Sequence, residues 1–395
     1  MSTLKVNAIR HTGASSDAIE LSSDGSCTVM ATNNLSNRNL IINGDMNIWQ
    51  RGDCPHTIAY AYSADRWERN FTLGGTDYYH IEKKTESPPG FSSSLEVSYG
   101  TAQASMSTNN YSLLRQKIEA QNLQHLAYGT SSAKKMTLSF WVRSNKTGTY
   151  AVHLQQGDNS NKQVSFNYSI SSADTWEKKT ISIPADTSGV INNDNGEGLS
   201  VTWWLAAGTN MTSGTLRNTA WTTYAAADQA VGQNVNLLDS TSNTWYITGV
   251  QLEVDSTGSG VATDFEHRSY GDEYNRCLRY FWLIANGSES AAGSGGSGLA
   301  PICTGNAYTS SSVFGIVPFP TRMRLAPSIY KVTSTDYWDV VQNNNNYQAD
   351  DVTINRSSTT SVSLYFSSNL SVTANYTCHV RTYNSSARLG VDAEL

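Results

Sequence analysis

A chain of 395 residues with 38% hydrophobic and 10% aromatic side chains is long enough for two or three domains, each with its own core. Only 15% of the residues are charged and the formal net charge is -6, without a basic stripe. Because contacts to phosphate need such a stripe, we expect no nucleic-acid partner. The longest apolar run, residues 280–285, is far too short to span a bilayer, so no membrane insertion is expected.

The abundance of Ser, Thr, Asn and Gly favours strands and turns, because Ser, Thr and Asn compete with the helical backbone for hydrogen bonds. Only residues 121–128 and 270–279 look helical. We therefore predict an all-β protein. Its five cysteines are odd in number and scattered along the chain, so neither a disulfide framework nor a zinc site is expected.

Residues 1–38 contain two short strand-like pieces followed by the hairpin signal Asp24-Gly25. The apolar residues of these pieces are Leu4, Val6, Ile9, Ile19 and Leu21. An isolated hairpin is marginally stable in water. This segment is therefore expected to need a partner surface, on another copy of the chain, on a neighbouring protein or on its own next domain.

Residues 39–270 alternate between short strands and turns, which predicts one large antiparallel β-sandwich. A strand buried on one side is expected from residue 243 onward. Its two predicted faces are Tyr246, Thr248, Val250 and Leu252 on one side, and Trp245, Ile247 and Gln251 on the other.

Residues 271–395 are expected to form a second, smaller β-sandwich. A strand is predicted at residues 279–286, and further strands are predicted from residue 311 onward. The Gly- and Ser-rich stretch 286–300 between them has the composition of a linker, but strands on both sides favour a long loop.

Several motifs of residues 39–270 resemble the carbohydrate-binding-module jelly roll: NGD with Trp49, SFWVRS with GTY, TW with ISIPADTSG, and WYITGVQLE. The next segment, ATDFEHRSYGDE with RCLRYF, is similar to a junction found in many bacteriophage tail fibre proteins. FPTRMRLAPSI and the ending GVDAEL resemble the small terminal sandwich of phage fibres. STLKVNAI and AIELSSDG resemble the N-terminus of tail fibre proteins from marine phages.

These resemblances imply a homotrimeric phage tail fibre protein, located in the virion tail. The N-terminal segment would dock on other phage tail proteins, and the terminal sandwich would bind host surface polysaccharide. Two alternatives remain open: a purely structural tail component, and a tail-associated polysaccharide hydrolase.

We expect no enzymatic activity. Glycan cleavage by the common mechanism uses two carboxylates at a defined separation. The acidic candidates, none at a spacing that predicts a cleft, are Asp45, Asp65, Glu68, Glu253, Asp264, Glu266, Asp272 and Glu273. His267 could serve as an acid or base, but we expect it to lock the domain junction by hydrogen bonds together with Glu266 and Arg268.

A metal or other cofactor is not expected either. The resembled modules often bind calcium through acidic residues of the first and last strands. Here the opening reads Asn43-Gly44-Asp45-Met46-Asn47 and the last strand Ile247-Thr248-Gly249-Val250. The family's carboxylates are absent from both stretches, apart from Asp45.

Sugar binding needs aromatic platforms flanked by polar groups. The candidates in polar stretches predicted to be loops are Trp221 and Tyr224, and in the terminal module Tyr337, Trp338 and Tyr347. For these loop residues, sugar binding and packing between subunits are evenly matched. Trp141 and Trp204 also fall out of phase with their apolar neighbours, although packing is favoured for Trp141, Trp203 and Trp67.

Overall fold

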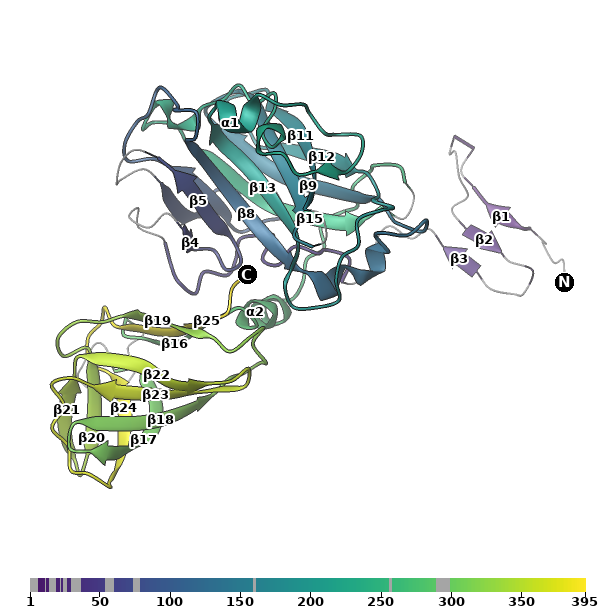
Figure 1. Ribbon diagram of the computed structural model, residues 1–395. Coiled ribbons are helices and arrows are strands. Elements are labelled where there is room, and N and C mark those ends of the chain that lie inside the picture. The colour runs from purple at the N-terminus through teal and green to yellow at the C-terminus, as the bar shows by residue number, and fades with distance from the viewer. Residues whose placement is uncertain are drawn as a thin grey trace.

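The computed structural model describes residues 6–10, 12–13, 19–21, 23, 27–29, 37–53, 60–73, 79–158, 161–255, 258–288 and 299–395. All strand pairs in these ranges are antiparallel, which confirms the predicted all-β class (Figure 1). In the described part of the chain, no helix is both long and apolar enough to cross a membrane.

The larger unit is a jelly-roll sandwich of two sheets (Figure 1). The seven-stranded sheet has the spatial order β14 (Thr222–Thr223), β11 (Lys162–Ile170), β10 (Gly148–Gln156), β13 (Glu197–Ala207), β8 (Tyr111–Glu119), β5 (Glu68–Thr72), β4 (Tyr60–Tyr62). The five-stranded sheet has the order β12 (Glu177–Ile183), β9 (Met136–Ser144), β15 (Trp245–Val254), β7 (Ser94–Ser98), β6 (His80–Lys84). Short helical turns lie between strands: η1 (Ala120–Leu126), α1 (Thr209–Thr212), η2 (Ala226–Asp228) and η3 (Leu237–Asp239).

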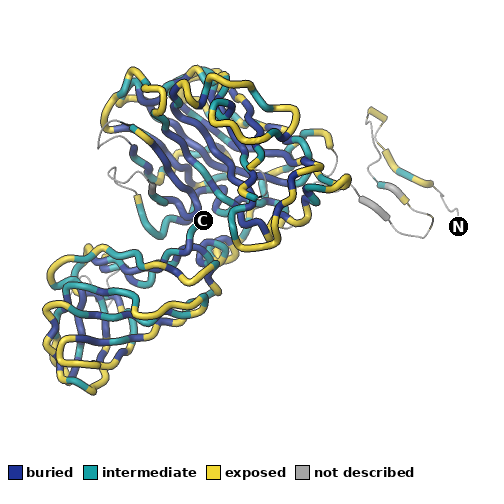
Figure 2. Tube along the Cα trace, in the orientation of Figure 1, coloured by how far each residue is buried: buried dark blue, intermediate teal, exposed yellow. Residues whose placement is uncertain are grey.

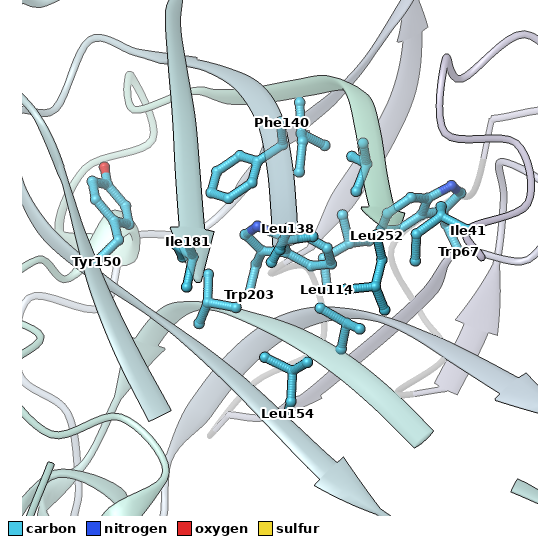
Figure 3. Close-up of a cluster of buried hydrophobic side chains, with 14 of the residues drawn as sticks. Ile41, Trp67, Leu114, Leu138, Phe140, Tyr150, Leu154, Ile181, Trp203 and Leu252 are labelled. Carbon is cyan, nitrogen blue, oxygen red and sulfur yellow. The ribbon is translucent and has the colours of Figure 1, made fainter. Parts of the chain in front are cut away.

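Inward-facing side chains of both sheets interdigitate in the core of the jelly roll (Figure 3). The ring of Trp203 lies 5.5 Å from that of Trp67 and 5.6 Å from that of Phe140, which comes from the opposite sheet. All three side chains are fully buried, in keeping with the buried strands of Figure 2. Burial of a large apolar side chain contributes roughly 1.5–3 kcal/mol, so this cluster is a main source of the sandwich's stability.

Strand β15 departs from the predicted alternation. Its pairing with β9 shifts register between Thr248 and Gln251, and Gly249 at this point has a φ of 60°. Such a bulge moves the following residues to the other face of the strand. Ile247 before the shift and Val250 after it therefore both lie in the core, and the prediction of two unbroken faces is wrong.

Both helical predictions are confirmed, as η1 and as α2 (Tyr270–Leu278). Helix α2 follows the jelly roll, and its N-cap residue Ser269 accepts a hydrogen bond from the backbone N–H of Asp272 at 3.2 Å. Ser is among the residues that best satisfy the free N–H groups of a first turn. The sequence did not indicate α1.

The smaller unit packs a three-stranded sheet against a curved seven-stranded sheet. The three-stranded sheet has the order β16 (Phe281–Asn286), β25 (Arg388–Asp392), β19 (Ser328–Val332). The seven-stranded sheet has the order β21 (Asn345–Ala349), β20 (Trp338–Gln342), β24 (Thr377–Thr382), β17 (Pro301–Thr309), β18 (Ser312–Pro318), β23 (Ser361–Ser367), β22 (Asp351–Ser357). The three-stranded sheet lies on the side of the jelly roll, and the larger sheet lies farther away (Figure 1).

The N-terminal segment forms a small sheet of β1 (Ala8–Ile9), β2 (Ile19–Leu21) and β3 (Cys27–Val29). Three of its predicted apolar contact residues, Val6, Ile9 and Leu21, are exposed, and Ile19 is half-buried. Leu4 lies outside the described residues. The exposure of the three residues is consistent with the prediction that this segment needs a partner surface.

The last residues of the chain return to the jelly roll (Figure 1). Arg66 forms an ion pair with Glu394, and Arg51 forms one with Asp392 at 2.8 Å. The hydroxyl of Tyr62 and the ammonium of Lys117 each donate to the backbone oxygen of Leu395 at 3.0 Å. The C-terminal strand of the small sandwich thus ends in a polar contact with the large one.

Candidate functional site

Trp338 is not an exposed loop residue, which corrects its prediction as a sugar platform. It opens strand β20 and is fully buried. Its indole N–H donates to the hydroxyl of Thr333 at 2.9 Å, and its ring lies 6.2 Å from that of Phe366 in the core of the small sandwich. A ring without exposed surface cannot stack on a sugar.

Tyr337 and Tyr347 are half-buried and pack against the same core. Tyr347 lies within strand β21, where it pairs with Val340, and therefore not in the predicted loop. The asparagines that suggested a loop, residues 343–346, form the tight turn of the β20–β21 hairpin and its first paired residues. The structure thus brings these tyrosines beside Trp338, with most of their surface turned away from solvent.

Trp221 is also corrected, since only 8% of its surface is exposed. Its indole N–H donates to the carbonyl of Pro184 at 2.7 Å, and its ring lies 5.9 Å from that of Tyr128. Tyr224 is 37% exposed and is the most accessible of the five predicted platform residues.

The segment that carries Trp221 and Tyr224 folds over the seven-stranded sheet of the jelly roll. The backbone N–H of Ser165 donates to the carbonyl of Arg217 at 2.9 Å, and Gln163 donates to the carbonyl of Ala225 at 2.9 Å. Met211 covers Trp204 on the same face, so Trp204 is buried outside the main core. Trp141, the other out-of-phase tryptophan, is half-buried.

A different set of aromatic rings is exposed together, on the outer face of the larger sheet of the small sandwich. We call Tyr308 of β17, Phe314 of β18 and Tyr365 of β23 the distal ladder. The ring centroids of Tyr308 and Phe314 are 5.4 Å apart, and those of Phe314 and Tyr365 are 4.9 Å apart. Tyr308 is 72% exposed, and the other two are half-buried.

Strand alternation places the distal ladder on this face. The residues next to it in sequence, Ala307, Val313, Leu364 and Phe366, all lie in the core. Phe314 and Tyr365 are direct cross-strand partners, so their rings meet at the spacing that stabilises antiparallel sheets.

Polar side chains flank the distal ladder. Asn306 pairs with Phe314, and Thr353 pairs with Tyr365. Ile316, 69% exposed, pairs with Ser363 on the same face. Aromatic faces beside amide and hydroxyl groups can stack on the C–H faces of sugars and bond to their hydroxyls. The surface therefore has the chemistry of a glycan-binding platform.

The sequence did contain a signal for the distal ladder. In SVSLYFS, Val362, Leu364 and Phe366 recur at every second position, which predicts the buried face of a strand and places Tyr365 on the other face. The predicted platform residues all come from predicted loops, so these three rings, which lie on strands, are not among them. Only the pairing of β17, β18 and β23 shows that the rings share one face.

Most of the acidic candidates have partners within the fold. Glu68 pairs with Arg115 at 2.8 Å, and Glu253 accepts hydrogen bonds from the N–H and hydroxyl of Thr263 at 2.9 and 2.7 Å. Asp65 accepts from the backbone N–H of Gln50 at 3.0 Å, and burial raises its pKa to about 6. The roles that the structure gives these carboxylates are structural.

Glu266 and Glu273, near the opening turn, surround Arg268 rather than an open metal cage, and Asp45 accepts a hydrogen bond from the side-chain amide of Asn47. The Arg268 guanidinium donates to both carboxylate oxygens of Glu273, at 3.3 and 3.0 Å, to Glu266 at 3.2 Å, and to the carbonyls of Ile41 and Asn39. A guanidinium is permanently charged. It supplies there the positive charge that calcium would bring, so these residues do not fit a bound cation.

The same contacts hold the start of the jelly roll at the junction. Glu266 accepts from the backbone N–H of Asn39 at 2.8 Å and from that of Asn37. The predicted hydrogen-bonded lock is confirmed for Glu266 and Arg268. For His267 it is corrected, because its ring packs against Phe91 and Phe265, with centroids at 5.3 and 4.9 Å.

No model of a protein family matches this sequence, and no curated protein matches it. Among solved structures, the chain is similar to the enzymatically active domain of tailspike protein 4 of bacteriophage CBA120, with 13% identity and a TM-score of 0.30 over 55% of this chain. That match spans 21% of the tailspike chain, about a fifth of its length.

Two further similar structures are matched over nearly their whole length. A putative sugar binding protein from Bacteroides thetaiotaomicron has 14% identity and a TM-score of 0.30, over 55% of this chain and 100% of that one. A family 11 carbohydrate-binding module from Clostridium thermocellum, in complex with a mixed-linked tetrasaccharide, has 12% identity and a TM-score of 0.26, over 55% of this chain and 98% of that one. Sequence identities and TM-scores this low assign neither a ligand nor an activity to the chain.

Proposed function

We propose that this chain is a non-enzymatic adhesion protein of a phage tail fibre, which binds host surface polysaccharide through the distal ladder. The observation that carries the proposal is the row of three touching rings, with Tyr308 at 72% exposure, on a sheet face flanked by amide and hydroxyl groups. A contiguous exposed apolar patch rimmed by polar residues is typical of an interaction site.

The positions of the distal ladder and of the N-terminal segment support this proposal. The distal ladder lies on the sheet farther from the jelly roll (Figure 1), and the N-terminal segment exposes Val6, Ile9 and Leu21 for a partner. We propose that this segment docks on other tail proteins in the virion. A homotrimer would present three copies of the ladder, and multivalency raises avidity without new contacts.

Replacement of Tyr308 by alanine tests the proposal. We expect binding of the full chain to purified host polysaccharide to weaken at least about tenfold, the equivalent of about 1.4 kcal/mol. Tyr383→Ala is the matched control, because Tyr383 is 46% exposed on the same sandwich and is not part of the ladder. Equal binding by wild type and Tyr308→Ala would contradict a role for the ladder.

Two further measurements separate the alternatives. Wild-type protein that binds no host polysaccharide, on beads or on an array, would favour a purely structural tail component. Steady release of reducing ends from the polysaccharide would favour a hydrolase. The molar mass from light scattering, for wild type and Tyr308→Glu, reports whether the chain is trimeric and whether the ladder packs between subunits.

A further inference from the structure

An open cleft of about 770 Å³ lies where the two sandwiches meet. One wall is the polar face of α2, with Ser269, Asp272, Arg276 and Arg279 at helical spacing. The lining also includes Arg322, from the loop between β18 and β19. This volume lies within the range of small-ligand sites.

Two of the arginines that line the cleft are already neutralised. Arg279 makes a two-pronged ion pair with the fully buried carboxylate of Glu119, at 2.7 and 2.8 Å. Arg268 is paired with Glu273. Of the acidic groups in the lining, Glu266 is paired with Arg268 at 3.2 Å, and Asp272 accepts a hydrogen bond from the neutral hydroxyl of Ser269 at 2.6 Å.

The other two arginines have no carboxylate partner in the described part of the chain. Arg276 donates to the neutral amide oxygen of Asn37. Arg322 is exposed and makes no ion pair or hydrogen bond with any residue that the structure describes. Guanidinium groups bind planar carboxylates through two parallel hydrogen bonds, so arginines in a cleft that lack a carboxylate partner are a fitting site for such a group.

We infer that this cleft binds a carboxylate-bearing sugar, with Arg276 and Arg322 as the groups that contact the acid. This inference rests on the proposed function, which it deepens by naming an acidic polysaccharide as the ligand class. The cleft lies at the junction of the sandwiches, because its lining combines Glu266, His267 and Arg268, which follow the jelly roll, with α2 and the Arg322 loop. A carboxylate between two arginines also gives selectivity over neutral sugars, since an uncharged group would leave both guanidinium groups unpaired.

Titration calorimetry of the full chain with an oligogalacturonate tests the inference, with the methyl-esterified oligomer as the neutral probe. We expect the acid to bind more tightly than the ester. Arg276→Gln and Arg322→Gln should each weaken binding of the acid about fivefold, and neither should change binding of the ester. Lys178→Gln is the matched control, because it removes one exposed positive charge from β12, outside the cleft.

Arg322→Gln is the decisive variant, because Arg322 supports no contact of the fold and its loss should leave the unfolding temperature unchanged. Equal affinity for acid and ester, or unchanged affinity in both variants, would overturn the inference. A dextran sulfate arm distinguishes carboxylate recognition from general anion binding, and tighter binding of dextran sulfate would also overturn it. Tyr308→Ala separates the two proposals. Loss of host-polysaccharide binding with intact oligogalacturonate binding supports both sites. Unchanged binding of both ligands contradicts the ladder alone, and loss of oligogalacturonate binding contradicts the cleft.

Discussion

The guanidinium of Arg66 lies 3.5 Å above the ring of Tyr280, and the same guanidinium is ion-paired with Glu394, 328 residues along the chain. Arg66 belongs to the jelly roll, Tyr280 follows α2, and Glu394 is the second-last residue. Arg51 repeats the arrangement, 3.5 Å above Phe281 and paired with Asp392. Desolvated cation–π contacts contribute about 2 kcal/mol each, so these arginines connect the two sandwiches firmly.

Glu394→Gln should lower the free energy of unfolding by about 3–5 kcal/mol, because it leaves the buried charge of Arg66 without its partner. Urea denaturation measures the change. Asp174→Asn is the control, since Asp174 is mostly exposed in its pair with Arg143 and loss of this pair should cost at most about 1 kcal/mol. Similar losses in both variants would contradict a special role of the C-terminal contact.

Asp65 should make the protein less stable as the pH rises from about 4 to about 6. Burial raises the pKa of Asp65 in the folded protein from 3.8 to about 6. The folded state therefore binds this proton more tightly than the unfolded state, and ionisation above pH 6 costs about 3 kcal/mol. Asp65→Asn should remove this part of the pH dependence of the free energy of unfolding. Urea denaturation at pH 4, 5, 6 and 7 checks it, and parallel pH profiles of wild type and variant would contradict it.

Trp338→Ala should destabilise the small sandwich by about 3–5 kcal/mol, as expected for removal of a fully buried aromatic side chain. Trp338→Phe should cost less, since it keeps most of the packing and loses the hydrogen bond to Thr333. Thermal unfolding followed by near-ultraviolet circular dichroism measures both. A Trp338→Ala protein with unchanged stability but no glycan binding would restore Trp338 as a contact residue.

Gly249→Ala should destabilise the jelly roll by more than about 1 kcal/mol. The position has a φ of 60°, and an added Cβ would lie 2.6 Å from the ring of Phe91. Gly271→Ala is a suitable control, because a Cβ on this residue of α2 would meet no atom within 4 Å. Denaturation midpoints of the two variants compare the sites, and equal midpoints would contradict the strain expected at the bulge.

The all-β class and the two helical stretches could be predicted from the sequence, because they depend on local preferences. Polar side chains that compete for backbone hydrogen bonds disfavour helices throughout, and Ser269 caps α2 with its own hydroxyl. Phe140 and Trp203 could likewise be placed in the core, since strict alternation along β9 and β13 leaves one face apolar.

Exposure depends instead on which strands pair and which segments cover them, and no local pattern carries that information. Trp338 resembled a loop residue because Tyr337 and the asparagines at 343–346 surround it in sequence, yet the core of the small sandwich encloses it. Tyr308 is 72% exposed because, among the residues that the structure describes, no segment covers its ring. Arg66 meets Glu394 only because the packing of the two sandwiches brings together residues that are 328 positions apart. A pattern of neighbouring residues in the sequence cannot predict such a contact.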